Sequence, residues 1–593
     1  MINWKRNGPS LTSRPHRFSW PEMPEDLPVD VFPCSNEEYL PPPPSKSQRA
    51  IMRLANAETE RMRRKFNMTR AEFVRTAAAM SIGFWAIDMV SPGLFGGFGW
   101  SHNTKTTDAC DLEWDGAKGM QTLRNLPGEF IFDVQSHHVD PDGMWRVSNP
   151  AIHAFFAALW PQSSAVTGDK PSVGPGGWLR GGGAGEVDPI ENLSRFHYLK
   201  ELFLDSATTM TVLSCVPTSP DTNNPLPLAE AALTVHTVND LARHKRSIMH
   251  AFVMPNRGSA GNTTPHQKPL FLDEELQLMM ERAHQYKHIL RGWKTYCPWG
   301  DVPNASGWFL DSDTGMAFLE QVVKVHRKFP QIPPVVASHK GFALPGFDQR
   351  AATPRDIGPA AKAYRDVRFL VYHSGHDTGD KQEKYAGDHK ARSDSNKVDA
   401  LIKSLRENNY DATKFKRKGH KFGNVPNVYA ELGSVWRDVM HDPDQCAHLL
   451  GKLIKYVGPK RVVWGTDSLW YGSPQAEIVG LRRFKFTERG KELYNLPYGL
   501  EGDVEDPTRK APRPSRTIRN AILGRNAARA YNIDPFRVGR EIDCDAVNGL
   551  KQHGYLSGVG TERESAPLAS NVAPGPRTRR EVLKSLRESP WSP

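Results

Sequence analysis

The sequence is poor in cysteine and has no long apolar run. Its 593 residues hold six cysteines, and no two of them form a Cys-x-x-Cys pair. This scatter excludes a disulfide framework and a thiolate zinc site, and Cys215 and Cys297, which fall on predicted strands, are expected to be packed thiols. No segment combines the length and apolarity of a membrane-spanning helix, so no membrane span is expected.

A basic face is also missing. The formal net charge is +11, but three segments carry the whole excess of Lys and Arg, namely residues 1–75, 377–425 and 551–593. The rest of the chain is neutral and has no basic stripe interleaved with aromatic residues. Because nucleic acids are bound through such surfaces, we expect no nucleic-acid partner and a small-molecule substrate instead.

Four apolar segments end in side chains that bind metals. The first starts at Phe130 and ends in Asp133-Val134-Gln135-Ser136-His137-His138. An apolar run that ends in polar groups is typical of a buried parallel strand opening into a site. Because strand side chains alternate, Asp133, Gln135 and His137 are predicted to share one face, while His138 packs outside.

The other three segments lie far along the chain and end at His339, His373 and Asp467. Side chains this distant in sequence meet when parallel strands close into a (β/α)8 TIM barrel, because the carboxyl ends of its strands converge on one mouth. Histidine nitrogens and a carboxylate in that place predict a pocket for one divalent metal ion, zinc in the first place and manganese or iron as alternatives.

Eight strand candidates occur in order, separated by helical patterns such as residues 272–288 and 445–457. This alternation predicts an α/β protein whose barrel occupies residues 126–535. Long loop insertions at residues 376–425 and 476–515 are expected on the catalytic face, and the glycine-rich residues 174–185 are a candidate flap. The strand candidates are residues 130–134, 210–216, 247–254, 292–296, 335–338, 369–372, 428–432 and 462–465.

Two appendages flank the predicted barrel. Residues 1–125 are expected to be an N-terminal extension with a flexible arm, and residues 536–593 a partly disordered tail. Residues 63–90 look like a degenerate twin-arginine export signal in which the second arginine has become Ala71. A buried or amphipathic helix is the preferred interpretation, because the segment starts far from the N-terminus and Asp88 interrupts it. We therefore expect a cytoplasmic protein, with periplasmic export as the alternative.

Taken together, these motifs resemble the amidohydrolase superfamily, in particular its amidohydrolase-related branch of aminocarboxymuconate-semialdehyde-decarboxylase-like enzymes. The resemblance spans residues 128–535 and includes a closing helix at residues 522–531. It implies metal ligands at His137, His339 and Asp467, with Asp467 and His373 as catalytic residues. The family has Asp-x-His-x-His on its first strand, and Gln135 stands in place of the first histidine, which makes Gln135 a weak or distal fourth ligand.

Three further residues are candidates for substrate binding, namely Lys294, Tyr372 and Trp470. Lys294 ends the fourth strand, where a lysine either binds a substrate carboxylate or, as in binuclear members of the superfamily, is carboxylated and bridges two metals. Tyr372 and Trp470 are candidate pocket walls. Glu431 on the seventh strand is a candidate partner of a ligand.

The resemblance implies a metal-dependent hydrolase that attacks a small organic substrate with an activated water. Gln135 departs from the decarboxylase pattern, and this favours hydrolysis over non-oxidative decarboxylation. A metal-dependent oxygenase and a metal-free binding subunit are the hypotheses from other classes. A homo-oligomer is expected.

Overall fold

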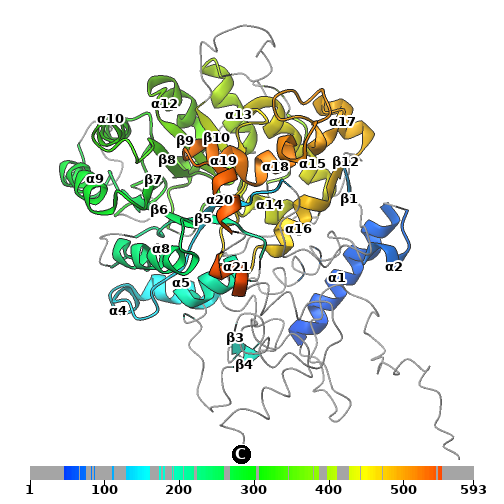
Figure 1. Ribbon diagram of the computed structural model, residues 1–593, viewed down its shortest axis with the longest axis horizontal. Coiled ribbons are helices and arrows are strands. Elements are labelled where there is room, and N and C mark those ends of the chain that lie inside the picture. The colour runs from blue at the N-terminus through cyan, green and yellow to red at the C-terminus, as the bar shows by residue number, and fades with distance from the viewer. Residues whose placement is uncertain are drawn as a thin grey trace, which may run out of the picture.

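The computed structural model describes the barrel and parts of the N-terminal extension (Figure 1). The described residues are 46–65, 67–74, 82, 86, 110–112, 128–159, 173–174, 178–179, 190, 193–204, 206–218, 223–259, 268–301, 306–344, 346–377, 380–385, 387, 397–410, 427–440, 442–470, 472–542 and 545–550.

Eight parallel strands form the centre of the molecule and lie side by side in sequence order. The sheet closes between its first strand and the segment after its last, where the amide of Val134 donates to the carbonyl of Trp464 and the amide of Asp467 donates to that of Gln135. The chain therefore folds as a (β/α)8 barrel, as predicted. The strands are β2 (Phe132–Ser136), β5 (Met210–Leu213), β6 (Ser247–Phe252), β7 (Leu290–Tyr296), β8 (Val335–His339), β9 (Arg368–Tyr372), β10 (Val428–Glu431) and β11 (Val462–Val463).

Helices connect the strands and surround the barrel (Figure 1). Their ends follow ordinary capping chemistry: the Ser312 side chain accepts from the amide of Gly315 where α10 begins, which satisfies one of the free amides of the first turn. The connecting helices are α4 (Trp145–Ser148), α5 (Pro150–Leu159), α7 (Arg195–Leu199), η2 (Lys200–Leu204), α8 (Leu228–Ala242), α9 (Leu272–Tyr286), α10 (Asp313–Lys328), α11 (Gln349–Ala352), η5 (Pro354–Asp356), α12 (Ile357–Ala363), η6 (His373–Gly375), α13 (Lys397–Glu407), α14 (Val435–Val439), α15 (Pro443–Lys452) and η8 (Leu453–Val457).

The chain after β11 closes the barrel and also meets the N-terminal extension. β12 (Phe484–Phe486) pairs antiparallel with β1 (Cys110–Leu112), and Lys65 at the end of α1 (Lys46–Lys65) forms an ion pair of 2.6 Å with Asp444 of α15. The extension is therefore attached to the side of the barrel at two places. The other elements are α2 (Arg70–Phe73), β3 (Val173–Gly174), β4 (Trp178–Leu179), α16 (Gln475–Arg483), α17 (Glu488–Tyr494), η9 (Gly499–Glu501), η10 (Pro514–Arg516), α18 (Ile518–Asn520), η11 (Ala521–Arg525), α19 (Asn526–Ala530), α20 (Pro535–Ile542) and α21 (Ala546–Leu550).

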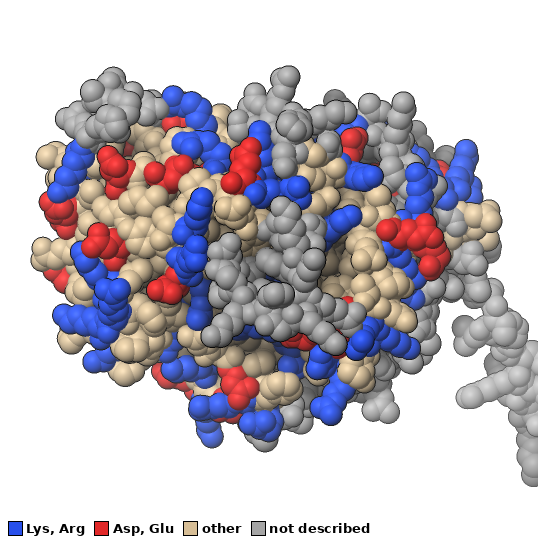
Figure 2. All heavy atoms as spheres, turned by 90° about the horizontal axis from the view of Figure 1, so that it is seen from above, with Lys and Arg blue, Asp and Glu red and all other residues tan. Residues whose placement is uncertain are grey.

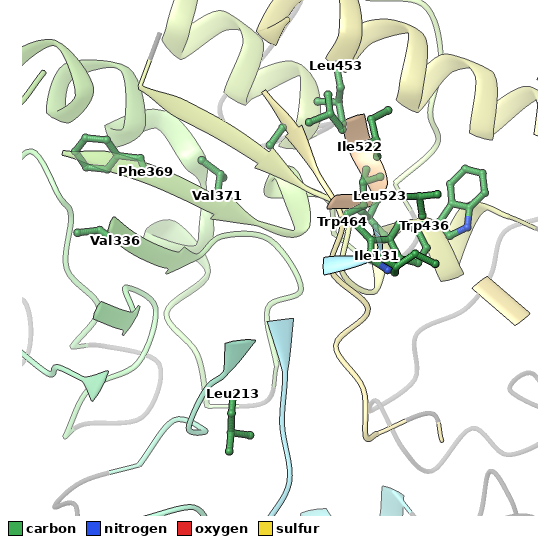
Figure 3. Close-up of a cluster of buried hydrophobic side chains, with 14 of the residues drawn as sticks. Ile131, Leu213, Val336, Phe369, Val371, Trp436, Leu453, Trp464, Ile522 and Leu523 are labelled. Carbon is green, nitrogen blue, oxygen red and sulfur yellow. The ribbon is translucent and has the colours of Figure 1, made fainter. Parts of the chain in front are cut away.

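The alternation of each strand divides the core into two layers. On β9, Phe369 and Val371 belong to the outer layer between sheet and helices (Figure 3), whereas Leu370 and Tyr372 belong to the inner layer that fills the barrel. A buried parallel strand must be apolar on both faces for this reason. Polar side chains inside the barrel are exceptions that call for a partner.

Strand β2 departs from the predicted alternation. Its register against β5 shifts between Asp133 and Ser136, which is the sign of a bulge. As a result, Val134 packs in the inner layer, and the side chain of its neighbour Gln135 still contacts Asp467 at the barrel mouth. The Asp133 carboxylate does not lie at the mouth, because it accepts hydrogen bonds from the amide and hydroxyl of Thr466. The expectation that Asp133, Gln135 and His137 share one face is wrong for Asp133.

All eight strand candidates overlap observed strands. The predicted helices at residues 272–288 and 445–457 are α9 and most of α15 with η8. Residues 376–425 are not one loop insertion, since α13 lies within them and connects β9 to β10. The predicted tail begins with α20 and α21. Most of residues 174–185 and of residues 63–90 lie outside the described residues, and none of the described helices is long and apolar enough to cross a membrane.

Candidate functional site

The ends of β2, β8 and β9 and the segment after β11 bring five predicted residues into one chain of contacts. Nε2 of His137 lies 3.1 Å from Oδ1 of Asp467, and the Gln135 amide nitrogen lies 2.8 Å from the same oxygen. That nitrogen is also 3.4 Å from Nε2 of His373, which lies 3.3 Å from Nδ1 of His339. Gln135 therefore joins a His137–Asp467 pair to a His339–His373 pair.

Backbone carbonyls fix which nitrogen of each imidazole carries its hydrogen. A carbonyl can only accept, so Nδ1 of His137 donates to Ser214 at 2.8 Å and Nδ1 of His373 donates to Gly433 at 2.7 Å. Nε2 of His339 likewise donates to Phe342 at 3.1 Å. In each neutral ring the other nitrogen is bare.

The bare nitrogens face one another and the carboxylate. Burial lowers the pKa of His373 to about 4 and that of His339 well below its usual value, so both rings are neutral near pH 7. Two lone pairs then meet 3.3 Å apart, and a third lone pair or a proton lies between His137 and Asp467. The Gln135 amide can donate to Asp467 and to Nε2 of His373, but Nδ1 of His339 has only the lone pair of His373 before it. Rings whose other nitrogen is held by a carbonyl are typical of metal-binding histidines.

Asp467 is held ionised. Burial raises the pKa of its carboxyl, but the contacts with His137 and His373 and a 2.6 Å hydrogen bond from Ser434 outweigh burial and lower the pKa below its usual value. A buried anionic oxygen beside ring nitrogens is the kind of group that can bind a divalent cation.

Among the described residues, no group of three or more His, Cys, Asp and Glu side chains is close enough by itself to hold a metal ion. The amide of Gln135 supplies the missing link. Its oxygen is buried without a hydrogen-bond partner, and a half-turn of the amide, which exchanges nitrogen and oxygen, points that oxygen at Asp467 and His373. With the amide oxygen included, the residues fit a divalent ion.

The backbone around the site adopts conformations that side chains rarely tolerate. His373, Ser434 and Asp467 have φ of 63°, 54° and 63°, in the left-handed region where a non-glycine residue costs energy. Each follows a barrel strand directly or within a few residues. Strain of this kind collects at functional sites and supports the assignment of one here.

Lys294 lies in the barrel below these groups, buried completely. Its Nζ has no hydrogen-bond partner in the described part of the chain and lies 3.6 Å from the centre of the Tyr372 ring and 4.4 Å from that of Tyr296. Burial lowers its pKa to about 7, against the attraction of Asp467. No anion is in hydrogen-bond contact with this amine in the described part of the chain.

The two predicted pocket walls differ in position. Trp470 is half-buried and stacks on His137 with ring centres 5.4 Å apart. Tyr372 is fully buried, and its hydroxyl donates to the carbonyl of Val134 at 2.5 Å, so it lies under the site. His138 packs outside the barrel as expected, bonded to Thr234, and burial lowers its pKa to about 3.

Glu431, a candidate ligand partner from the sequence, accepts from the amide of His373 at 2.8 Å. Ser434, Gly433 and Gly465 were not identified from the sequence, and a side chain at either glycine would collide with the Glu431 carboxylate. Burial raises the pKa of Glu431 well above its usual value. The pattern Glu431-Leu432-Gly433-Ser434 after a strand is the signal that could have found them.

Residues 333–533 match the model of the Amidohydrolase family. The match begins just before β8, ends after α19 and includes His339, His373 and Asp467, so it confirms the resemblance for these three strand-end motifs. The first-strand motif with Gln135 and His137 lies outside the matched residues. A search of curated proteins gives no match.

Solved structures that resemble the chain are remote in sequence. 5-Carboxyvanillate decarboxylase from Sphingomonas paucimobilis is 14% identical over 68% of this chain and 99% of its own, with a TM-score of 0.34. A putative 2-pyrone-4,6-dicarboxylic acid hydrolase from Pseudomonas putida is 12% identical over 62% and 97%, with a TM-score of 0.29. A dihydroxybenzoic acid decarboxylase from Polaromonas sp. JS666 with bound manganese is 11% identical over 62% and 97%, with a TM-score of 0.30. Likenesses at this level carry no information on reaction or substrate.

Proposed function

We propose that this amidohydrolase-related chain is a metal-dependent hydrolase acting on a small organic substrate that carries a carboxylate. The observation that carries the proposal is the set of imidazole nitrogens of His137, His339 and His373 that are directed at Asp467 and at one another. In His137 and His339, the two proposed histidine ligands, the opposite ring nitrogen is tied to a backbone carbonyl, of Ser214 and Phe342 respectively. Such pre-set tautomers are what metal ligation requires.

His137, His339 and Asp467 would hold the ion, with the oxygen of Gln135 as the fourth ligand. A bound divalent ion acidifies water and polarises a substrate oxygen. Asp467 would bind the ion through Oδ1, which faces His137 and Gln135, and Oδ2, which Ser434 orients, would accept the proton of the attacking water. Zinc suits these nitrogen and oxygen ligands, and manganese and iron suit them too.

His373 is assigned to proton transfer. Its Nδ1 hydrogen is committed to Gly433 and its own amide to Glu431, so Nε2 is the one basic atom that the ring offers to the site. Nε2 takes up a proton and returns it to the leaving group, the usual task of a neutral imidazole. The ring packs against Phe342, with centres 4.9 Å apart, which holds its orientation.

Lys294 is the reason for proposing that the substrate carries a carboxylate. A buried ammonium without an anion gains most from a substrate that brings one. The same placement favours hydrolysis over decarboxylation. A cation that binds the carboxylate stabilises charge on the group that must lose it as carbon dioxide departs, and this works against a decarboxylation transition state.

The test compares lactone, ester and amide substrates, each with and without a carboxylate, using protein loaded with Zn²⁺ or Mn²⁺. We expect hydrolysis of the carboxylate-bearing member of a pair, with KM raised in Lys294→Met and unchanged in Lys362→Met, a lysine on the outer helix α12. Release of carbon dioxide without hydrolysis would replace the proposal with decarboxylation. Oxygen consumption with bound iron would indicate an oxygenase, and a protein that binds no metal would be a binding subunit.

The charge distribution on one face of the molecule is relevant to the kind of partner that the protein binds. On the face shown in Figure 2, Asp and Glu are scattered among more numerous Lys and Arg. We keep the homo-oligomer as part of the proposal, to be tested by the molar mass in solution.

A further inference from the structure

A second set of polar side chains lies inside the barrel, beneath the candidate site. It starts at Tyr531, just after α19 at the closed end, and continues through His250 on β6 and Ser214 after β5 to Tyr372 on β9. All four side chains are buried. The inside of a barrel is normally apolar, so a histidine at its centre calls for a reason.

The contacts of His250 are close and numerous. Nε2 lies 2.8 Å from the Tyr531 hydroxyl, and the two rings stack with centres 5.7 Å apart. Nδ1 lies 3.0 Å from Oγ of Ser214 and 3.5 Å from the hydroxyl of Tyr372. The ring also needs Gly292 on β7, because a Cβ there would come within 2.9 Å of its Cδ2.

The direction of these hydrogen bonds follows from their far end. The carbonyl of Val134 can only accept, so the Tyr372 hydroxyl donates to it and can itself only accept from its other neighbours. Burial lowers the pKa of His250 well below its usual value and raises that of Tyr531. The imidazole is therefore neutral and the phenol keeps its hydrogen.

One arrangement satisfies every group. Tyr531 donates to Nε2 of His250, Nδ1 donates to Ser214, Ser214 donates to Tyr372, and Tyr372 donates to Val134. In the reverse tautomer, bare Nδ1 would face the lone pairs of Tyr372, and the Tyr531 hydrogen would lose its acceptor. A fully satisfied buried network is rigid, and a half-satisfied one is costly.

The network ends at the backbone of the site. Val134 precedes Gln135, Tyr372 precedes His373, and the carbonyl of Ser214 accepts Nδ1 of His137. Gln135 and His137 at the end of β2 and His373 at the end of β9 are therefore each joined to this network by one peptide bond or one hydrogen bond. We infer that His250 is a positioning residue, which through Ser214 and Tyr372 fixes the strand ends that carry Gln135, His137 and His373. The inference rests on the proposed function, because it concerns the same site.

Two substitutions of His250 separate positioning from simple filling of space. Phenylalanine keeps an aromatic ring beside Tyr531 but has no polar atom, whereas the amide of asparagine places a donor near the position of Nδ1 and leaves part of the space empty. If His250 positions the site, His250→Asn retains Co²⁺ affinity better than His250→Phe. If it only fills space, the order is the reverse.

The measurement is Co²⁺ titration of metal-free full-length protein, followed by the visible absorption of the bound ion. Partners of ligands are worth 10- to 100-fold in metal affinity. We expect a loss of about tenfold or more in His250→Phe, a smaller loss in His250→Asn and in the milder Tyr531→Phe, and an altered spectrum in all three. The control is Tyr410→Phe, which removes a buried hydroxyl bonded to Val428 and Val457 away from the site and should leave affinity and spectrum unchanged.

Amide hydrogen exchange without metal gives a second readout. His250→Phe should speed exchange in peptides covering residues 132–138 and 370–376, and Tyr410→Phe should not. If wild-type protein binds no Co²⁺, the proposed function fails, while the exchange rates still decide the positioning role. Unchanged exchange in these peptides, or Co²⁺ affinity of His250→Phe within twofold of wild type, would overturn it.

Discussion

The amide nitrogen of Gln135 and the carboxylate of Asp467 lie 2.8 Å apart, and their contact joins the first strand of the barrel to the segment after the last. It also links the His137–Asp467 pair to the His339–His373 pair. Four predictions follow from this arrangement and from the buried lysine below it.

Gln135→His should tighten metal binding. Imidazole is a better ligand than an amide for borderline divalent ions, and the bulge in β2 already directs residue 135 to the mouth. We expect slower loss of Zn²⁺ to a chelator, roughly tenfold, with turnover equal or lower because an added ligand closes an open position. Chelator resistance equal to wild type, together with metal loss in His137→Ala, would mean that residue 135 is not a ligand.

Asp467→Asn and His373→Asn should have different consequences. The aspartate supplies the negative charge that holds a cation, so its loss lowers both metal content and turnover. His373→Asn should keep the metal and lower kcat by roughly a hundred- to ten-thousand-fold, the usual contribution of one general acid or base. Metal content measured beside kcat separates the two roles. A metal-free His373→Asn protein would make His373 a ligand.

Two fully buried lysines should respond in opposite directions to replacement by methionine. Lys340 is paired at 2.8 Å with the equally buried Asp356. Lys340→Met leaves the buried carboxylate without its cation and should lower the free energy of unfolding by about 3–5 kcal/mol. Lys294 has no such partner, and Lys294→Met should raise the free energy of unfolding by about 1–3 kcal/mol. Denaturant unfolding of both variants at pH 6 provides the measurement, and a strongly destabilised Lys294→Met would show that its ammonium has an anion in the folded protein.

The stabilisation by Lys294→Met should depend on pH. Burial lowers the pKa of Lys294 from 10.5 to about 7, so between these values the unfolded chain binds a proton that the folded chain does not. Wild-type stability therefore gains from this group as pH rises from about 7 to 10, whereas below pH 7 the buried charge is present and its cost is complete. The advantage of the variant should be largest at pH 6 and smaller at pH 9. An advantage that is independent of pH would contradict the lowered pKa.

The sequence was sufficient for the barrel and for much of the candidate site, for one physical reason. Parallel strands are apolar on both faces until they end, so polar residues such as His339 and His373 mark strand ends in the sequence itself. The order of those ends then predicted that they meet. The identification needed no knowledge of side-chain contacts.

Other features depend on partners far along the chain. The bulge of β2 is a property of two strands, and alternation along one strand placed Asp133 at the mouth when its carboxylate is instead used by Thr466. His250 stands in a strand that looks wholly structural, and its contact with Tyr531 spans 281 residues. The contacts of Tyr372 with Val134 and His250 likewise could not be derived from the residues next to Tyr372 in the sequence.

The space that Gly292 leaves for His250 has an evolutionary consequence. An imidazole at position 250 and a Cβ at position 292 would occupy overlapping volume, with 2.9 Å between the Cβ and Cδ2. Among relatives of this chain, positions 250 and 292 should therefore change together. A relative with a side chain at position 292 should have a smaller residue than histidine at position 250. Without that histidine, the hydroxyl of Tyr531 has no acceptor, so we expect position 531 to vary as well.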